Sequence, residues 1–471
     1  MATKRYFGMF TRILSIAIVM LNAFNPTPAY AGSSHENIYQ TTSCATSGDL
    51  VIATGETCSL STGTYTYNTV TIQSGGTLIL LGNTTQNKGV TIIANSMTVE
   101  TGGKINADGK GYTSGGPGGG YGPNPTWTGG GAGHGGVGEN GDGAGGIGYG
   151  SVTTPVMLGS AGGVGRCGLI SICPGGAGGG AIKLQISGTL LLDGDISANG
   201  LTGGGRAGGG SGGSIMVEAG TLSGSGTIRS IGGAGSDGGG DGAGGRIAIY
   251  YGTSTFSLDP QHLQARGMYL NGNGGGPGTV YLKDTGSQQN KLVVDNNGNS
   301  VTTYAVHPAG GYSYDQIEVR GKAKLRLIGS SSQFNLTGND VLVGDGTGQL
   351  EIEGTITTSP DLTLSSVSLI VLGNIQGAEN VTIQSPAVLS LYATSPLHSG
   401  IYTFTNLTIE NGGTFKAVTS GNGDTNYTND PYLQLNLTNL TVETGGVLTA
   451  DGTGYPGKHE SGSGPGAGGS A

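Results

Sequence analysis

A repeat of 32 to 33 residues is the feature of this sequence that most restricts its fold. Three segments bounded by glycine align with one another: 178–205, 212–240 and 244–254. In this alignment Ile182, Ile215 and Ile247 coincide, and so do Ile196 and Ile228. Fixed periods of this length are typical of solenoids and propellers, in which each repeat buries its apolar face against the next.

The pattern also returns at much longer range. The segment TVETGGKINADG at 98–109 occurs again as TVETGGVLTADG at 441–452, and residues 61–78 resemble 398–415. A module of about 340 residues therefore begins again near residue 398. We expect 398–471 to be the truncated start of a second copy of this module.

Within each repeat, short runs carry apolar residues at alternate positions. Val70 and Ile72 are one example, and Ile247 and Ile249 are another. A period of two places such residues on one face of a strand, and stacked copies can bury that face at a spacing of about 4.8 Å. Propeller blades would need hairpin turns, which do not dominate here. The sequence therefore predicts an all-β fold, specifically a right-handed parallel β-helix, in preference to a propeller or a sandwich.

Glycine makes up 100 of the 471 residues, and 53 of these lie in 111–250. Their spacing lacks the strict period of collagen. The glycine-rich segments leave the strands at equivalent corners, so we expect them to stack as lateral loops. Chains without Cβ atoms can pack backbone against backbone, which predicts polyglycine-II-like strands; flexible loops are the alternative.

The N-terminus has the pattern of a secretory signal peptide. A basic start precedes the apolar run 13–21, which is too short to span a bilayer, and Ala29-Tyr30-Ala31 forms a small-residue cleavage site. No other stretch is long enough for a transmembrane helix. We expect five parts along the chain. These are a signal peptide (1–31), an N-terminal cap with the first coils (32–110), glycine-rich repeats (111–250), further coils (251–397) and the truncated second copy (398–471).

If the protein is exported, its four cysteines are expected to form disulfide bonds. Four cysteines allow three pairings, and proximity favours Cys44 with Cys58 and Cys167 with Cys173 in an oxidising compartment. The sequence thus predicts two structural disulfides. The net charge of −9 disfavours nucleic acid as a partner.

Calcium is the one metal that the sequence suggests. The stretch GGAGSDGGGDGAGG resembles the calcium-binding nonapeptide of toxin repeats and contains Asp237 and Asp241. A second stretch, GENGDGAGG, offers Glu139 and Asp142. The apolar position of the motif is occupied by Gly239, and the motif does not recur in tandem. These four carboxylates are weak candidates for calcium, and we expect no other cofactor.

Two fragments resemble pieces of polygalacturonases, namely Gly-His134-Gly and Arg320-Gly-Lys322. Hydrolysis of a glycosidic bond needs paired acids around that bond, and the sequence has no Asp-Asp pair. His134 and Arg320 are also some 185 residues apart. The sequence therefore predicts a protein that is not an enzyme.

Four stretches together resemble the glycine-rich β-strand repeat modules of large bacterial surface and adhesin-like proteins: 98–109, 238–251, 278–298 and 441–452. The resemblance implies a secreted or cell-surface parallel β-helix with a structural or adhesive role, and it brings no catalytic residues. We expect a rigid stalk or binding surface whose partner is an extracellular polysaccharide or a host or neighbouring cell. The alternatives are a polysaccharide-binding or polysaccharide-cleaving β-helix, and a protein that binds ice or a crystalline surface through rows of threonine.

Overall fold

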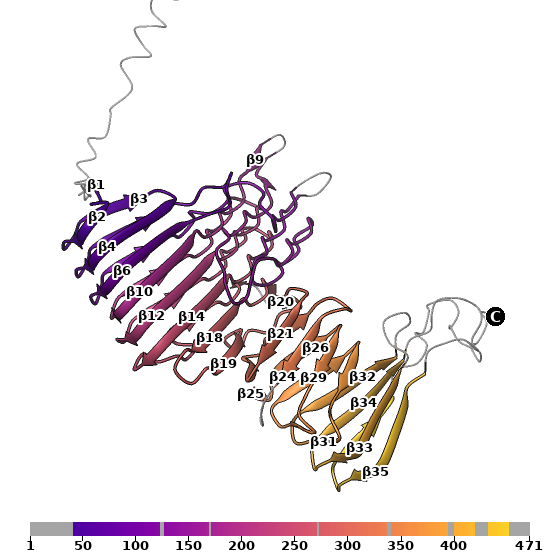
Figure 1. Cartoon of the computed structure of the whole chain (residues 1–471). Helices are drawn as coiled ribbons and strands as arrows, with labels where there is room; N and C mark the ends of the chain where they lie inside the picture. The colour runs from indigo at the N-terminus through magenta and orange to yellow at the C-terminus, as the bar shows by residue number, and fades with distance from the viewer. Residues whose placement is uncertain are drawn as a thin grey trace, which may run out of the picture. The chain divides into compact units, whose positions relative to one another are not determined.

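The computed structural model describes residues 41–451, apart from six gaps: 123–126, 169–170, 271–272, 337–340, 394–399 and 420–431. Every helix or strand in these ranges is a strand, β1 to β36, and the strands form seven sheets (Figure 1). The prediction of an all-β fold is therefore confirmed. The signal peptide predicted at 1–31 lies outside the described residues.

Two long sheets receive strands in alternation along the first half of the chain. The N-terminal seven-stranded sheet consists of β1 (Thr41–Ser43), β3 (Thr57–Leu60), β5 (Thr77–Leu80), β7 (Lys104–Asn106), β11 (Asp195–Ser197), β13 (Thr227–Arg229) and β15 (Leu263–Gln264). The ten-stranded sheet consists of β2 (Ser47–Ile52), β4 (Gly63–Ile72), β6 (Val90–Val99), β10 (Ala181–Leu192), β12 (Ser214–Ser223), β14 (Arg246–Ser254), β18 (Thr279–Asp284), β19 (Asn290–Asp295), β22 (Gln316–Arg320) and β25 (Leu342–Gly344). Up to the pair of β14 with β18, neighbouring strands within each of these two sheets are parallel and belong to successive repeats.

The pairing follows the repeat found in the sequence. Ile182 of β10 lies opposite Ile215 of β12, which lies opposite Ile247 of β14. In the N-terminal seven-stranded sheet, Ile196 of β11 lies opposite Ile228 of β13. Residues that coincide in the alignment are therefore neighbours in space.

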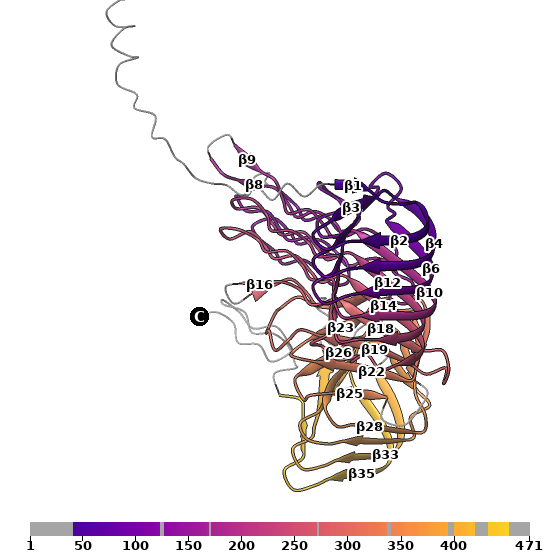
Figure 2. The same ribbon diagram turned by 90° about the vertical axis from the view of Figure 1, so that its left-hand side faces the viewer.

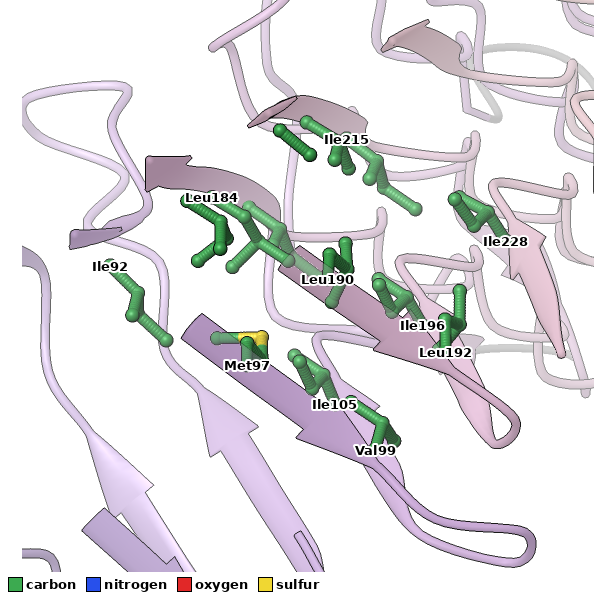
Figure 3. Packing of buried hydrophobic residues seen from close by; sticks show 14 of the residues in the cluster. Ile92, Met97, Val99, Ile105, Leu184, Leu190, Leu192, Ile196, Ile215 and Ile228 are labelled. Atoms are coloured by element: carbon green, nitrogen blue, oxygen red, sulfur yellow. The ribbon is translucent and has the colours of Figure 1, made fainter. Parts of the chain in front are cut away.

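Stacked apolar side chains fill the space between these two sheets (Figure 3). This first core holds columns such as Met97 and Leu190 from the ten-stranded sheet, facing Ile105 and Ile196 from the other sheet. These side chains are almost wholly buried. Because each strand is short, burial depends on the copies before and after it. Disulfide Cys44–Cys58 joins the turn before β2 to β3, as the sequence predicted.

The core changes faces at β18 and β19. These strands form an antiparallel hairpin across the turn 285–289, with Tyr281 opposite Leu292. On β18, Val280 and Leu282 belong to the first core, whereas Tyr281 belongs to a second core. On β19 two residues, Leu292 and Val294, belong to the second core, and only Val293 belongs to the first core. The sheet is thus continuous while the buried interior moves to its other side.

Three further parallel sheets enclose the second core. The C-terminal seven-stranded sheet contains β20 (Ala305–His307), β23 (Lys324–Leu327), β26 (Gly348–Ile352), β29 (Val367–Val371), β32 (Val388–Ala393), β34 (Thr414–Thr419) and β36 (Val447–Thr449). The β21 sheet contains β21 (Gly311–Tyr314), β24 (Gln333–Leu336), β27 (Thr355–Thr357) and β30 (Asn374–Gln376). The β28 sheet contains β28 (Asp361–Leu364), β31 (Asn380–Ile383), β33 (Ile401–Ile409) and β35 (Gln434–Val442). Leu325, Leu350, Leu369 and Leu389 stack in one buried column.

The long-range repeat also has a structural counterpart. β4 pairs with β6 so that Val70 lies opposite Met97, and β33 pairs with β35 so that Leu407 lies opposite Leu440. The two similar sequence segments therefore form the same kind of strand pair. The end of the predicted second copy, 452–471, lies outside the described residues.

The glycine-rich segments lie to one side of the strands, with the short hairpins β8 (Gly165–Arg166) with β9 (Ile172–Cys173) and β16 (Tyr269–Leu270) with β17 (Asn273–Gly274) among them (Figure 2). We call these segments the glycine layer: 111–122, 127–165, 174–180, 199–213, 231–245, 265–270 and 273–278. Consecutive residues of the layer donate backbone hydrogen bonds to separate partners, for example Gly208 to Gly163, Gly209 to Gly240 and Gly210 to Leu201, at 2.8, 2.9 and 3.0 Å. The same change of partner occurs at 131–133 and 242–244.

The layer is packed too closely for side chains. A Cβ atom added at Gly131, Gly162 or Gly208 would lie 1.9 to 2.0 Å from a backbone carbonyl oxygen of a neighbouring segment. Only glycine permits such an approach. Disulfide Cys167–Cys173 closes the β8–β9 hairpin, again as predicted.

Candidate functional site

The four carboxylates proposed as calcium ligands divide into one pair and two separate residues. Glu139 and Asp241 come together, because a Glu139 carboxylate oxygen accepts the backbone N–H of Asp241 at 2.9 Å. Both carboxylate oxygens of Asp241 accept further backbone N–H groups, from Gly235 and Leu270, at 2.7 Å. Burial raises the pKa of Glu139 and of Asp241. The pair therefore satisfies backbone donors inside the glycine layer.

Asp142 and Asp237 lie elsewhere. One Asp142 oxygen accepts the backbone N–H groups of Trp127 and Thr128, each at 3.1 Å. Asp237 is exposed at a turn with a positive φ of 47°. Within the described ranges no three His, Cys, Asp or Glu side chains gather in a way that could hold a metal ion. Calcium binding stays a prediction, for which the described residues supply a pair of carboxylates.

His134 lies in a buried polar cluster that the sequence did not predict. It has no solvent-exposed surface, and its Nδ1 is 2.8 Å from the carbonyl oxygen of Gly212. The centre of its ring lies 4.5 Å from that of Tyr149, with the two rings tilted by 31°, and its Nε2 has no hydrogen-bond partner among the described residues. Burial, followed by the charge of Arg246, lowers the pKa of His134 to about 3. The imidazole is therefore neutral and enclosed, a poor position for polysaccharide chemistry.

Arg246 is the centre of this cluster. Its guanidinium is fully buried and donates to the carbonyl oxygens of Tyr149 at 2.8 Å and Val306 at 2.9 Å, and to Thr279 Oγ1 at 3.1 Å. Burial lowers its pKa to about 10, so the group remains charged at neutral pH. Because its acceptors come from the glycine layer, β18 and β20, Arg246 joins three parts of the fold. No local pattern around GGRIAIYY signals this, since the acceptors are distant in sequence.

A second buried histidine lies in the same region. His307 Nε2 is 2.6 Å from the hydroxyl of Tyr314, and its Nδ1 is 3.0 Å from the carbonyl oxygen of Pro308. Since a carbonyl only accepts, Nδ1 carries the proton and Nε2 accepts from the tyrosine. Burial lowers the pKa of His307 to about 3. This histidine is also neutral, and it has a structural role in the second core.

Arg320 and Lys322 have structural surroundings as well. Arg320 forms ion pairs with Asp295 at 2.8 Å and Glu318 at 2.7 Å on the ten-stranded sheet. Lys322 occupies a turn with a φ of 58°. No hydrogen bond or ion pair among the described residues joins Arg320 to His134. The structure does not bring these two polygalacturonase-like fragments into one contact.

A cavity of about 220 Å³ lies where the first core ends. Leu263, Val280, Leu282 and Val293 line its apolar part. Its polar lining includes the Asp295–Arg320 ion pair and several other residues, namely Asp259, Gln261, Gln264, Arg266 and Asn297. An apolar floor with a few polar groups is typical of a small-ligand site.

The β28 sheet carries two regular columns of polar side chains. In the first, Asn439 donates to Asn406 at 2.7 Å, Asn406 to Asn380 at 2.6 Å, and Asn380 to Asp361 at 2.6 Å. Two residues further along each strand, a threonine column is in register: Thr363, Thr382, Thr408 and Thr441. Rows of threonine were expected only for the alternative in which the protein binds ice or a crystalline surface, and no residues were assigned to them. The short Asx-x-Thr repeats of β28, β31, β33 and β35 were the signal that sequence reasoning missed.

No described helix is long and apolar enough to cross a membrane. Comparison with known proteins found no family model, no curated protein and no solved structure that matches this chain.

Proposed function

We propose that this protein is an exported structural or adhesive solenoid of the cell surface, a right-handed parallel β-helix that acts as a stalk or binding surface and not as an enzyme. The observation that carries the proposal is the register of equivalent residues in successive repeats, such as Ile182, Ile215 and Ile247. Such stacking suits a rigid element that displays its outer side chains at fixed spacing.

The strand order supports the β-helix. Successive strands enter the two long sheets alternately, and each pairs in parallel with its equivalent one repeat later. The change of face at β18 and β19 agrees with a constant hand. An antiparallel pair reverses the direction of the strands, so the coil keeps the same hand only if its interior moves to the opposite face. Parallel β connections are right-handed in about 98% of cases.

The hydrogen bonds of the glycine layer support polyglycine-II-like packing. A polyproline-II chain has three residues per turn, so consecutive N–H groups point in three directions. Gly208 and Gly209 donate to two other segments and Gly210 donates back to Leu201 of its own segment, so three consecutive N–H groups have three separate partners, as expected for this geometry. Such a layer would stiffen the solenoid along one side.

Export is supported by the two disulfides, which are compatible with an extracellular location. The predicted signal peptide and the resemblance to adhesin-like surface modules agree with it. The ligand we propose is an extracellular polysaccharide, because a surface protein of this kind would meet such polymers first.

The test is incubation of the purified protein with a panel of neutral and acidic polysaccharides, following both retention of the protein and polymer length. We expect retention on at least one polymer, with no shortening of any. Shortening of a polymer beyond the protein-free control would overturn the proposal and direct attention to the cavity at the end of the first core. A lack of retention on every polymer would leave no support for an adhesive role.

The polar columns favour a second candidate function, binding to an ordered surface such as crystalline polysaccharide or ice. Adjacent parallel strands lie about 4.8 Å apart, so the Asn and Thr columns form a regular grid. Lysine at Thr382 and Thr408 would interrupt the centre of this grid, while lysine at the exposed Thr64 is a matched control. Retention on cellulose crystals or inhibition of ice growth should be lost in the first variant alone. Equal activity of both variants would remove this candidate.

A further inference from the structure

The only tryptophan of the chain is the centre of a small cationic cluster in the glycine layer. Trp127 is 50% exposed. The guanidinium carbons of Arg166 and Arg206 each lie 5.6 Å from the centre of a Trp127 ring. Arg166 belongs to β8, and Arg206 lies in another segment of the layer, so the fold brings together three residues that are 39 and 40 positions apart in sequence.

Neither arginine forms an ion pair with an acidic side chain among the described residues. Arg229, Arg320 and Arg326 each pair with Asp or Glu, whereas Arg166 and Arg206 do not. The nearby carboxylate of Asp142 accepts the backbone N–H groups of Trp127 and Thr128. Two guanidinium groups that form no ion pair among the described residues thus lie on one ring, and the exposed carboxylate of Asp237 lies near Gly205, the residue before Arg206.

The backbone holds these three residues in place. The carbonyl oxygen of Trp127 accepts the N–H of Arg166 at 3.1 Å, and the carbonyl oxygen of Arg206 accepts the N–H of Gly129 at 2.8 Å. Disulfide Cys167–Cys173 begins directly after Arg166. A site whose backbone is fixed in this way loses little conformational freedom when a ligand binds.

The side chains of the cluster favour a ligand that carries an oxyanion. A guanidinium that lies over an aromatic ring still presents the N–H groups of its planar edge, which match the two oxygens of a carboxylate or a sulfate. Two such groups beside one exposed indole suit a ligand with a repeated negative charge and apolar C–H surface. A polymer of sugar acids has both properties.

We propose that Trp127, Arg166 and Arg206 form a binding site for the carboxylate groups of an acidic polysaccharide. The inference rests on the proposed adhesive function and names its ligand class and its site. Neutral polysaccharides lack the oxyanion and should not bind here, while sulfated polymers share the charge and test how far the site depends on carboxylate geometry.

The experiment uses the fluorescence of Trp127, which no other tryptophan obscures. The purified full-length protein is titrated with oligogalacturonate, sulfated dextran oligomers and neutral dextran oligomers at low and at moderate salt. We expect a saturable fluorescence change with oligogalacturonate, weaker at moderate salt, and none with neutral dextran. A response to sulfated oligomers of equal strength would assign the site to oxyanions in general and overturn the assignment to carboxylates.

Three double variants distinguish binding at the Trp127 site from a general effect of the protein's charge. R166Q/R206Q should weaken binding by about tenfold or more, because each charged hydrogen bond is lost. R166K/R206K keeps the charge without the planar fork and should bind with intermediate affinity. K88Q/K104Q removes the same charge from two exposed lysines elsewhere and should change the affinity less than about twofold. Far-UV circular dichroism and the wild-type emission maximum would confirm that each variant is folded.

Unchanged affinity in R166Q/R206Q, or an equal loss in K88Q/K104Q, would overturn the proposal. Retention on a polysaccharide without any response of Trp127 would leave the adhesive function in place and reject this site. Shortening of the oligogalacturonate would instead reject the proposed function itself.

Discussion

Replacement of Gly131 by alanine should loosen the glycine layer. The added Cβ would lie 1.9 Å from the carbonyl oxygen of Asp241 and 2.9 Å from that of Gly240. Real Cβ atoms essentially never approach another atom more closely than 3.0 Å, so the Asp241 carbonyl must move by about 1 Å. This carbonyl accepts the N–H of Glu139 at 2.9 Å, and Glu139 in turn accepts the N–H of Gly131 at 2.8 Å. The strain therefore falls on two hydrogen bonds that hold the layer together.

The size of the effect follows from these contacts. Overpacking a well-packed interior costs about 1–3 kcal/mol, and leaving a buried backbone group without its partner costs about 1–3 kcal/mol. We therefore expect Gly131→Ala to lower the free energy of unfolding of the layer by about 2–6 kcal/mol. That is a large part of the about 5–15 kcal/mol that stabilises a typical domain.

Denaturant unfolding with two signals measures this loss. Fluorescence of Trp127 reports on the glycine layer, because Trp127 lies within it, whereas far-UV circular dichroism reports mainly on the strands. The matched control is Gly311→Ala, since a Cβ at exposed Gly311 would meet no atom within 4 Å and its φ is not positive. This control should be unchanged or stabilised by up to about 1 kcal/mol.

A fluorescence transition of Gly131→Ala within about 0.5 kcal/mol of the wild type would refute backbone packing of the layer, because that is the usual range for harmless surface substitutions. Equal destabilisation by both alanine variants would refute it as well, since the control introduces no close contact.

Three further predictions concern other parts of the fold. His134 and His307 have a pKa of about 3 in the folded chain against an ordinary 6.5, so the unfolded chain binds more protons between these values. The free energy of unfolding should fall as the pH is lowered from about 6.5 towards 3, by up to about 1.4 kcal/mol per pH unit for each histidine. Urea unfolding at several pH values should show that this free energy depends less steeply on pH in His134→Gln than in the wild type. Removing Cys44 and Cys58 together should lower the free energy of unfolding by about 3 kcal/mol, because their bond closes a loop of about 15 residues. Denaturant unfolding of oxidised wild type and oxidised C44A/C58A, which keeps Cys167–Cys173, provides the check, and equal midpoints would contradict it. Asn406→Ala should cost about 1 kcal/mol in thermal unfolding, since it removes both ladder hydrogen bonds of that side chain, and an unchanged transition would show that the ladder contributes nothing.

The pairing of equivalent strands could be predicted from the sequence because the segments that pair repeat one another. Ile182, Ile215 and Ile247 occupy equivalent positions in similar segments, and a period of two with one buried face leaves little freedom in register. Both disulfides followed from proximity in sequence.

The change of core was not predicted, although a signal was present. Strand β18 contains the unbroken apolar run Val280, Tyr281 and Leu282, and β19 contains Leu292, Val293 and Val294. Runs without alternation are typical of strands buried on both faces, which is what the two cores require.

The candidate sites could not be predicted in the same way, because their residues meet through the tertiary fold. The acceptors of Arg246 lie 97 residues before it and 60 residues after it. Trp127 meets its arginines only because the glycine layer folds back on itself. Neither the contacts of Arg246 nor those of Trp127 follow from a local sequence pattern. The carboxylates of Glu139 and Asp241 suggested a calcium site, but their described contacts are to backbone N–H groups.

The glycine layer also has a mechanical consequence. A stack of coils joined only to their nearest neighbours can unravel from an end, one coil at a time. Here the single segment 129–139 is hydrogen-bonded to residues from four later parts of the chain: Arg206 and Gly209, Asp241 and Gly244, Gly276, and Tyr304 and Val306. In the proposed solenoid, pulling on one coil would therefore load several others at once. The glycine layer would join the coils along the stack, and we expect such a protein to unfold under tension in one cooperative step at high force.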